Sequence, residues 1–426
     1  MMEKRKGKGK AKGKGNAAAL NVPFGIVAAS SVKPKECVPD QLYQNCASLK
    51  QQKQILTFLF DPAQWMRWWQ TYEFNPSMKQ SMRLLVQIGT IDAVLRGKYF
   101  LPDGTGVLLN KKQMEKACLS SRMYASDHFK ARSKKSSAGS TTSTTSTTYM
   151  VVEGDCLEAA IWLKDKSGLA CNPAVLNMAS RSHPCGGYRS GAGAQEENLA
   201  RRTNLFQCLE DPYKIDSSRS WSYPLPEFGG VYSPRVCVFR SAESHGYAFM
   251  QKPDFLSIIS AFAYKSPPLD IAHDGEEPRL SGSIVKHVQH KISAILNIAL
   301  DNGHDSIVLS AFGCGAYGNP PTHTAQLFKQ VILSSFANCF KVVMFAIYED
   351  HNSGKEHNPI GNVKPFAEVF GVPVMRLSEL LSEREGAERD EEKENKEGGD
   401  VTRQNDRGQT GSNEPNLQQQ QGSNFT

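Results

Sequence analysis

Two adjacent glutamates, Glu196 and Glu197, close the glycine-rich segment RSHPCGGYRSGAGAQEE. A positioned carboxyl group can give up a proton and later take one back, so this pair is a candidate general acid–base. Acidic side chains in the first turn of a helix are ordinarily explained by the helix macrodipole, and for the pair alone that explanation is the stronger one. The preceding GGYRSGAGA shifts the balance, because so many glycines are costly in backbone entropy unless they shape a site.

Two glycine-rich loops each follow an apolar run and precede a helical pattern: LNMAS leads into the first, and VLSAF into GCGAYGNPP. In an open α/β sheet such loops lie at the carboxyl ends of strands, where ligands bind. Backbone N–H groups can approach a phosphate closely where there is no Cβ, and a helix N-terminus adds positive potential. Two facing loops fit a diphosphate, whereas the alternative is that the glycines only allow tight turns.

The elements around these loops alternate, which predicts a layered α/β domain over residues 149–380. We expect strands at YMVVEG, AVLNMAS, SIVLSAF and KVVMFAIYE, with two short strand pieces in GGVYSPRVCVFR. Helical periodicity is expected in DCLEAAIWLKDK, EENLARRTNLFQCLE, SIVKHVQHKISAILNIALDNG and THTAQLFKQVILSSF.

Residues 39–130 are predicted to form a helical extension in which no chemistry is visible. Trp65, Trp68 and Trp69 have the spacing of one helical face. They could bind a base or a sugar, but a core between two helices is the favoured interpretation. A second helix, in MKQSMRLLVQIGTIDAVLRGKYFLPDG, is expected to end near Gly97.

Three segments have compositions that predict disorder, because they offer nothing to bury. They are the Lys/Gly-rich arm 1–38, the Ser/Thr-rich linker 131–148 and the acidic, Gln-rich tail 381–426. The formal net charge of the chain is +7, and much of it lies in the first fourteen residues. The part between the tails is therefore only mildly basic, which is weak support for nucleic-acid binding.

Ten cysteines are scattered without a C-x-x-C pair, and several lie in apolar runs. They are interpreted as reduced thiols of an intracellular protein, mostly core residues. No histidines pair with acids or cysteines at metal-ligand spacing, so neither a metal nor a cofactor is expected. No secretory or membrane-spanning segment is predicted.

Four segments of the sequence resemble segments of a known family. HPCGGYRSGAGAQEENLARRTNLFQCL is similar to the signature loop of the microbial-type poly(ADP-ribose) glycohydrolase catalytic domain, and LSAFGCGAYGNPP is similar to that family's diphosphate-binding loop. VYSPRVCVFR and VLRGKYFLPDGTGVLL resemble further segments, so the likeness spans roughly 85–375. It implies a macrodomain-like three-layer α/β/α sandwich with a mixed sheet, and hydrolysis of ribose–ribose O-glycosidic bonds in poly(ADP-ribose) to release ADP-ribose.

The resemblance also implies roles for single residues. Glu197 matches the glutamate that protonates the leaving 2′-oxygen and then activates water, and Glu196 matches its neighbour that orients the ribose hydroxyls. Asn177 fits a ribose-contacting position, and Asp155 resembles an adenine-contacting aspartate, although an N-cap is an equal alternative. The remaining substrate-binding candidates are Gln195, Gly186, Gly187, Gly313, Cys314, Gly315, Ala316, Tyr317 and Gly318.

The sequence departs from the family pattern at Cys185, which occupies the first position of the expected glycine triplet. If that position needs positive φ, cysteine strains the loop by roughly 1–2 kcal/mol; otherwise its side chain narrows the pocket. A redox-sensitive thiol there is the less favoured interpretation. The Ser/Thr-rich linker is a second departure, and it raises the question of how tightly the extension packs on the catalytic domain.

The sequence is also compatible with two other functions. One is a reader that binds ADP-ribose without cleaving it, which would have no need of the Glu197 carboxyl. The other is nucleic-acid association through the basic arm, without sequence preference and with steep salt dependence. The expected partners are poly(ADP-ribose) and ADP-ribosylated proteins, and we expect a monomer in the nucleus, the cytoplasm or both.

Overall fold

The computed structural model describes residues 61–126, 128, 146–270, 277–349, 353, 358 and 360–382. The arm 1–38, the start of the extension, most of the linker 131–148 and nearly all of the tail 381–426 lie outside these residues. The chain divides into a unit that ends at Leu377 and a unit Ser378–Thr426, of which only 378–382 are described.

An eight-stranded mixed sheet forms the centre of the first unit, with the strand order β12-β4-β11-β10-β5-β7-β6-β3. Neighbouring strands from β12 to β7 are parallel, whereas β6 is antiparallel to β7 and β3 to β6. The strands are β3 Arg122–Tyr124, β4 Thr148–Glu153, β5 Pro173–Met178, β6 Gly230–Arg240, β7 Phe249–Ala261, β10 Ser306–Leu309, β11 Val342–Ile347 and β12 Val374–Arg376.

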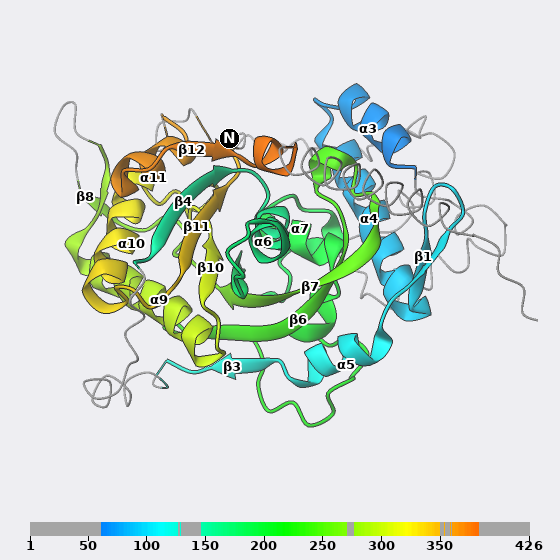
Figure 1. Ribbon diagram of the computed structural model, residues 1–426, viewed down its shortest axis with the longest axis horizontal. Coiled ribbons are helices and arrows are strands. Elements are labelled where there is room, and N and C mark those ends of the chain that lie inside the picture. The colour runs from blue at the N-terminus through cyan, green and yellow to red at the C-terminus, as the bar shows by residue number, and fades with distance from the viewer. Residues whose placement is uncertain are drawn as a thin grey trace, which may run out of the picture. The chain divides into compact units, whose positions relative to one another are not determined.

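Helices cover both faces of this sheet (Figure 1). On one face lie α6 Cys156–Ile161, with a π-helical turn at Trp162–Lys166, and α7 Gln195–Arg202; on the other lie α9 Gly282–Asp301, α10 Pro321–Ser335 and α11 Val363–Phe370. Ile307 and Leu309 of β10 belong to the core packed against α9 and α10, and Val308 between them is buried on the opposite face. The expected three-layer sandwich with a mixed sheet is therefore confirmed.

The extension consists of α3 Pro62–Thr71, α4 Pro76–Arg96, the hairpin β1 Lys98–Phe100 and β2 Gly106–Leu108, and α5 Lys111–Leu119. As expected, α4 ends at Gly97, which adopts the left-handed conformation (φ 71°) that favours glycine. Trp65 is buried, stacks on Trp69 with ring centroids 4.8 Å apart, and packs against methionines of α4. The tryptophan face thus forms a helix–helix core, as the sequence favoured.

Two expectations about secondary structure were wrong. GGVYSPRVCVFR forms one strand, β6, and not two pieces, because a bulge between Ser233 and Val236 accommodates Pro234 without ending the pairing. EENLARRTNLFQCLE breaks into α7 and α8 Leu205–Leu209, because Thr203 is extended and forms an isolated bridge with Val238.

Four small elements are also present among the described residues: the paired strands β8 Leu269–Asp270 and β9 Arg279–Leu280, and short 3-10 turns at Tyr188–Ser190 and Glu243–His245. The described cysteines are all free, and all but Cys339 are buried, in agreement with the expected core thiols. Within the described ranges, no helix combines the length and apolarity needed to cross a bilayer.

Candidate active site

The first glycine-rich loop leaves β5 after Met178 and reaches α7 at Gln195. Its backbone is pressed against the two candidate carboxyl groups. A Cβ at Gly186, where φ is 57°, would lie 2.3 Å from Oε1 of Glu197 and 2.9 Å from Oε2 of Glu196. Only glycine fits there, and the close approach lets the N–H of Gly187 donate a 2.7 Å hydrogen bond to Oε1 of Glu197.

Both glutamates are buried, with 3% of Glu196 and 7% of Glu197 exposed, although they occupy the first turn of α7. An acidic side chain can interact with the helix macrodipole while it is exposed to solvent. The burial of both glutamates therefore favours a role in a ligand site. The second oxygen of Glu197, Oε2, is buried and finds no hydrogen-bond partner among the described residues. One carboxyl oxygen is therefore fixed by the loop, and the other is left for a ligand.

Glu196 is held by the end of β5. Its Oε2 accepts a 2.7 Å hydrogen bond from the N–H of Ser180, and Nδ2 of Asn177 lies 3.5 Å from Oε1. Burial is the main cause that raises the pKa of Glu196 well above its usual range, and the charge of Glu197 raises it further. The protonated form of this carboxyl is favoured, so it can donate as well as accept a hydrogen bond.

Asn177 and Gln195 differ in what they leave for a substrate. Nδ2 of Asn177 also donates to Oγ of Ser260 at 3.0 Å, but its buried Oδ1 has no partner among the described residues. The amide of Gln195 instead accepts from the N–H of Met178 at 2.7 Å and donates to the carbonyl of Leu176 at 2.8 Å. The structure thus gives Gln195 a positioning role, because its amide ties α7 to the end of β5.

The second loop follows β10 and adopts positive φ at Gly313 (81°) and Gly318 (67°). Nδ2 of Asn319 braces it with a 3.0 Å hydrogen bond to the carbonyl of Gly313. No described group accepts from the backbone N–H groups of Gly315, Ala316 or Tyr317. Three consecutive unpaired donors on a glycine loop are the arrangement that binds phosphate oxygens.

Cys314 and Tyr317 in this loop face different surroundings. Cys314 is fully buried, and burial raises the pKa of its thiol to about 12, so the side chain is a packing residue. The pKa of the Tyr317 phenol is raised first by burial and then by the charges of Glu196 and Glu197. The two loops follow the neighbouring parallel strands β5 and β10, so both lie at the carboxyl ends of these strands and can share one site.

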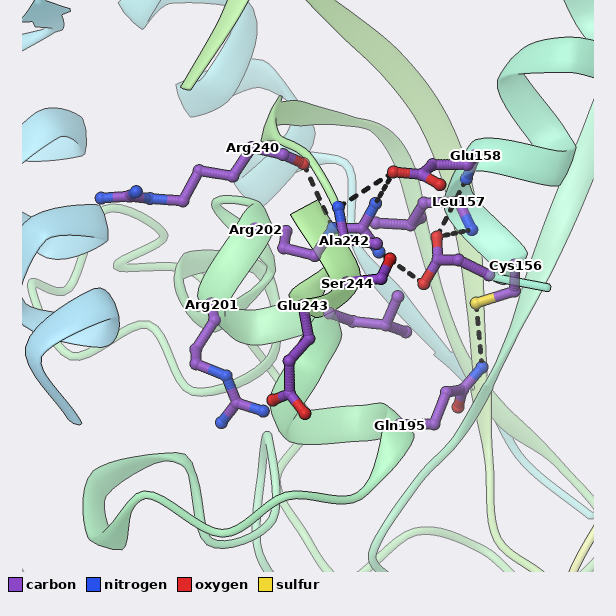
Figure 2. Close-up of polar contacts among 12 residues, drawn as sticks. Cys156, Leu157, Glu158, Gln195, Arg201, Arg202, Arg240, Ala242, Glu243 and Ser244 are labelled. Carbon is purple, nitrogen blue, oxygen red and sulfur yellow. Dashed lines mark hydrogen bonds and ion pairs between the residues drawn. The ribbon is translucent and has the colours of Figure 1, made fainter. Parts of the chain in front are cut away.

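Asp155 has the N-cap role that the sequence left as an alternative to adenine binding. Its Oδ1 accepts from the N–H groups of Leu157 and Glu158 at the start of α6. Its Oδ2 accepts a 2.6 Å hydrogen bond from the buried guanidinium of Arg202, which also lies 3.8 Å from Glu158. Figure 2 shows Leu157, Glu158 and Arg202 of this group, with Gln195 reaching Cys156 from the start of α7. Both carboxylate oxygens of Asp155 thus make hydrogen bonds that stabilise the fold.

Sequence reasoning missed the support that α4 gives to the first loop. A Cβ at Gly191 would lie 2.2 Å from the carbonyl oxygen of Gln80, and one at Gly193 would lie 2.2 Å from Nη1 of Arg83. Arg201 of α7 also donates a 2.7 Å hydrogen bond to the carbonyl of Ala192 in this loop. The glycines signalled a close approach, but nothing in the sequence identified α4 as the approaching element. The extension therefore packs directly on the loop.

Cys185 is a strained substitution, since its φ is 58° and it precedes a second left-handed residue. Its side chain is fully buried, so it cannot narrow an open pocket. Burial, with a further contribution from the charge of Glu196, raises the pKa of the thiol well above its usual range. A neutral, enclosed thiol is poorly suited to redox sensing. Among the described residues, no three His, Cys, Asp or Glu side chains gather as metal ligands.

Comparisons with known proteins agree with this geometry. The family model of the microbial-type PARG catalytic domain matches residues 88–241, which include the whole first loop and α7. A crystal structure of poly(ADP-ribose) glycohydrolase from Thermomonospora curvata is similar, with 26% identity, a TM-score of 0.54, and coverage of 68% of this chain and 99% of that chain. Another, of that enzyme bound to the inhibitor ADP-HPD, shows 26% identity, a TM-score of 0.51, and coverage of 67% and 98%. A search of curated proteins gave no match. The expected resemblance is confirmed.

We predict that Arg202→Met lowers the free energy of unfolding by about 3–5 kcal/mol, because it leaves the carboxylates of Asp155 and Glu158 without their buried cation. Denaturant unfolding measures the change. The control is Lys364→Met, which breaks the exposed Lys364–Glu368 pair and should change stability by about 0.5 kcal/mol or less. Equal effects of the two substitutions would contradict the account.

Replacing Cys185 should reveal the backbone strain. We predict that Cys185→Gly is more stable than Cys185→Ala by about 1 kcal/mol, since both lose the thiol and only alanine keeps the left-handed penalty. At the buried helical Cys208 the order should reverse, with alanine about 1 kcal/mol more stable than glycine. The same order at both positions in thermal unfolding would argue against strain at Cys185.

Proposed function

We propose that this protein is a poly(ADP-ribose) glycohydrolase that cleaves ribose–ribose O-glycosidic bonds and releases ADP-ribose, with Glu197 as the general acid and base. The match to a PARG catalytic domain and the likeness to solved glycohydrolases indicate the reaction. The observation that carries the residue assignment is the buried Glu197 carboxyl, which is fixed through one oxygen by Gly187 and has no partner for the other among the described residues.

In the first half of the reaction Glu197 gives its proton to the 2′-oxygen of the departing unit as the bond from the ribosyl C1 to that oxygen breaks. The ribosyl centre becomes cationic, and this furanosyl cation is comparatively accessible. In the second half the Glu197 carboxylate takes a proton from water while the water oxygen bonds to C1. One carboxyl that serves in turn as acid and base balances the reaction.

The neighbouring groups hold the substrate for this step. Glu196, with its raised pKa, can exchange hydrogen bonds with the ribose hydroxyls, and the unpaired Oδ1 of Asn177 supports a further ribose contact. The unpaired N–H groups of residues 315–317 support binding of the diphosphate. Tyr317 supports an aromatic contact beside the scissile ribose, while Asp155, occupied in capping α6, is a weaker candidate for the adenine.

The proposal also covers the partners, the oligomeric state and the cellular compartment of the protein. The proposal includes ADP-ribosylated proteins as carriers of the substrate, a monomeric enzyme, and action in the nucleus or cytoplasm, where poly(ADP-ribose) formed in the DNA damage response would be removed. The lysines among residues 4–14 support an accessory contact with nucleic acid.

The test of the assignment is Glu197→Gln, which keeps the size of the side chain and removes its proton transfer. Release of ADP-ribose from polymer should fall at least about 100-fold, because general acid–base catalysis contributes about that much or more. Binding of ADP-ribose, measured by calorimetry, should change little. If the unsubstituted protein binds ADP-ribose and releases none from polymer, the chain is a reader and the enzyme proposal is wrong.

Deleting residues 1–16 tests the accessory role of the basic arm. We expect weaker binding to duplex DNA, with a shallower dependence of affinity on salt, because fewer phosphate contacts release fewer counterions. Turnover of free polymer should be unchanged. Unaltered DNA affinity at low salt would remove the arm from the proposal.

A further inference from the structure

A cavity of about 380 Å³ lies beside the first loop, and the proposed mechanism does not use it. Its wall is formed mainly by the segment between α8 and β6, including Trp221 and Tyr223, and is completed by Pro184 of the first loop. A volume of this size falls in the range of small-ligand pockets.

The cavity is close to the proposed catalytic carboxyl. Pro184 is only two residues before Gly186, whose backbone contacts Glu197, and consecutive Cα atoms are about 3.8 Å apart. Tyr223 is another residue of the cavity wall. Its hydroxyl is buried and has no partner among the described residues.

Two acidic residues of the cavity wall, Glu210 and Asp211, already have partners. Glu210 accepts from the hydroxyl of Tyr188 and pairs with Arg189, both in the first loop. Asp211 accepts two backbone N–H bonds, from Ile215 at 2.8 Å and Asp216 at 2.9 Å. The wall also carries the cations Lys214 and Arg219, so these acidic groups do not make the cavity strongly negative.

The ring of Trp221, the ammonium group of Lys214 and two serine hydroxyls remain for a ligand. The guanidinium of Arg219 lies 4.4 Å from the ring centroid of Trp221, which fixes the ring from one side. The exposed residues Ser217 and Ser222 add hydroxyl groups that can donate and accept. Flat heterocycles stack on aromatic rings, and their edges hydrogen-bond to such groups. The wall therefore suits a nucleotide, because Trp221 can stack on its base and the Lys214 ammonium group can attract its phosphate.

We propose that this cavity binds the adenosine of the departing ADP-ribose unit, the unit whose 2′-oxygen is protonated by Glu197. The inference rests on the proposed function. In the ribose–ribose bond the departing 2′-oxygen belongs to the ribose that carries adenine. The adenine is therefore separated from the Glu197 carboxyl by about the length of one ribose ring. The cavity is lined by Pro184, two residues before the glycine whose backbone contacts Glu197, so it adjoins the loop that holds this carboxyl.

The experiment compares two substrates that share the ADP-ribosyl part and differ in the departing group. One is poly(ADP-ribose), and the other is ADP-ribose with a 4-nitrophenyl group on C1 of the distal ribose, which has no departing adenosine. Ser222→Trp fills the cavity from an exposed position. It should lower the ratio of kcat/KM on polymer to kcat/KM on the aryl substrate about tenfold.

Ser220→Trp is the matched control, because Ser220 is exposed and does not line the cavity. It should leave the ratio unchanged. Ser217→Trp, which fills the cavity from another position, repeats the test if Ser222→Trp does not fold by circular dichroism. An unchanged ratio in both filled variants would overturn the inference while the proposed function stood. An unsubstituted protein that cleaves neither substrate would instead refute the proposed function.

Discussion

The structure depends on the contact between the carboxyl group of Glu197 and the backbone of Gly186 and Gly187. A 2.7 Å hydrogen bond and a space too small for any Cβ bring a loop and a helix terminus together around a buried acid. Burial of an acidic group is unfavourable unless polar groups surround it. Here the loop supplies one such group and leaves the second oxygen of Glu197 for a substrate, which links the stability of the loop to the chemistry.

Further layers hold that contact in place. Gln195 ties the start of α7 to β5, Ser180 holds Glu196, and Arg201 holds the carbonyl of Ala192. Outside these, α4 fits against two loop glycines, so the helical extension belongs to the architecture of the site although it carries no chemistry of its own. A site assembled from loops becomes precise when such neighbours restrict the loops.

The sequence predicted what local patterns determine. Strand, glycine loop and helix could be recognised in LNMAS through NLARR because glycine and apolar periodicity act within a few residues. The break at Thr203 and the bulge near Pro234 escaped prediction, since each depends on pairing with a distant strand. The double use of Asp155 and the anchoring by Gln195 escaped for the same reason, because the sequence does not show which buried partner a polar side chain will meet.

The most direct measurement of the central claim is a crystal structure of the protein with ADP-ribose. The account predicts that the diphosphate lies on the backbone of residues 313–318. It further predicts that the hydroxyl on C1 of the distal ribose lies at hydrogen-bond distance, about 2.6–3.2 Å, from the Glu197 oxygen that Gly187 does not bind. A complex in which the diphosphate occupies that loop while the distal ribose points away from Glu197 would contradict it.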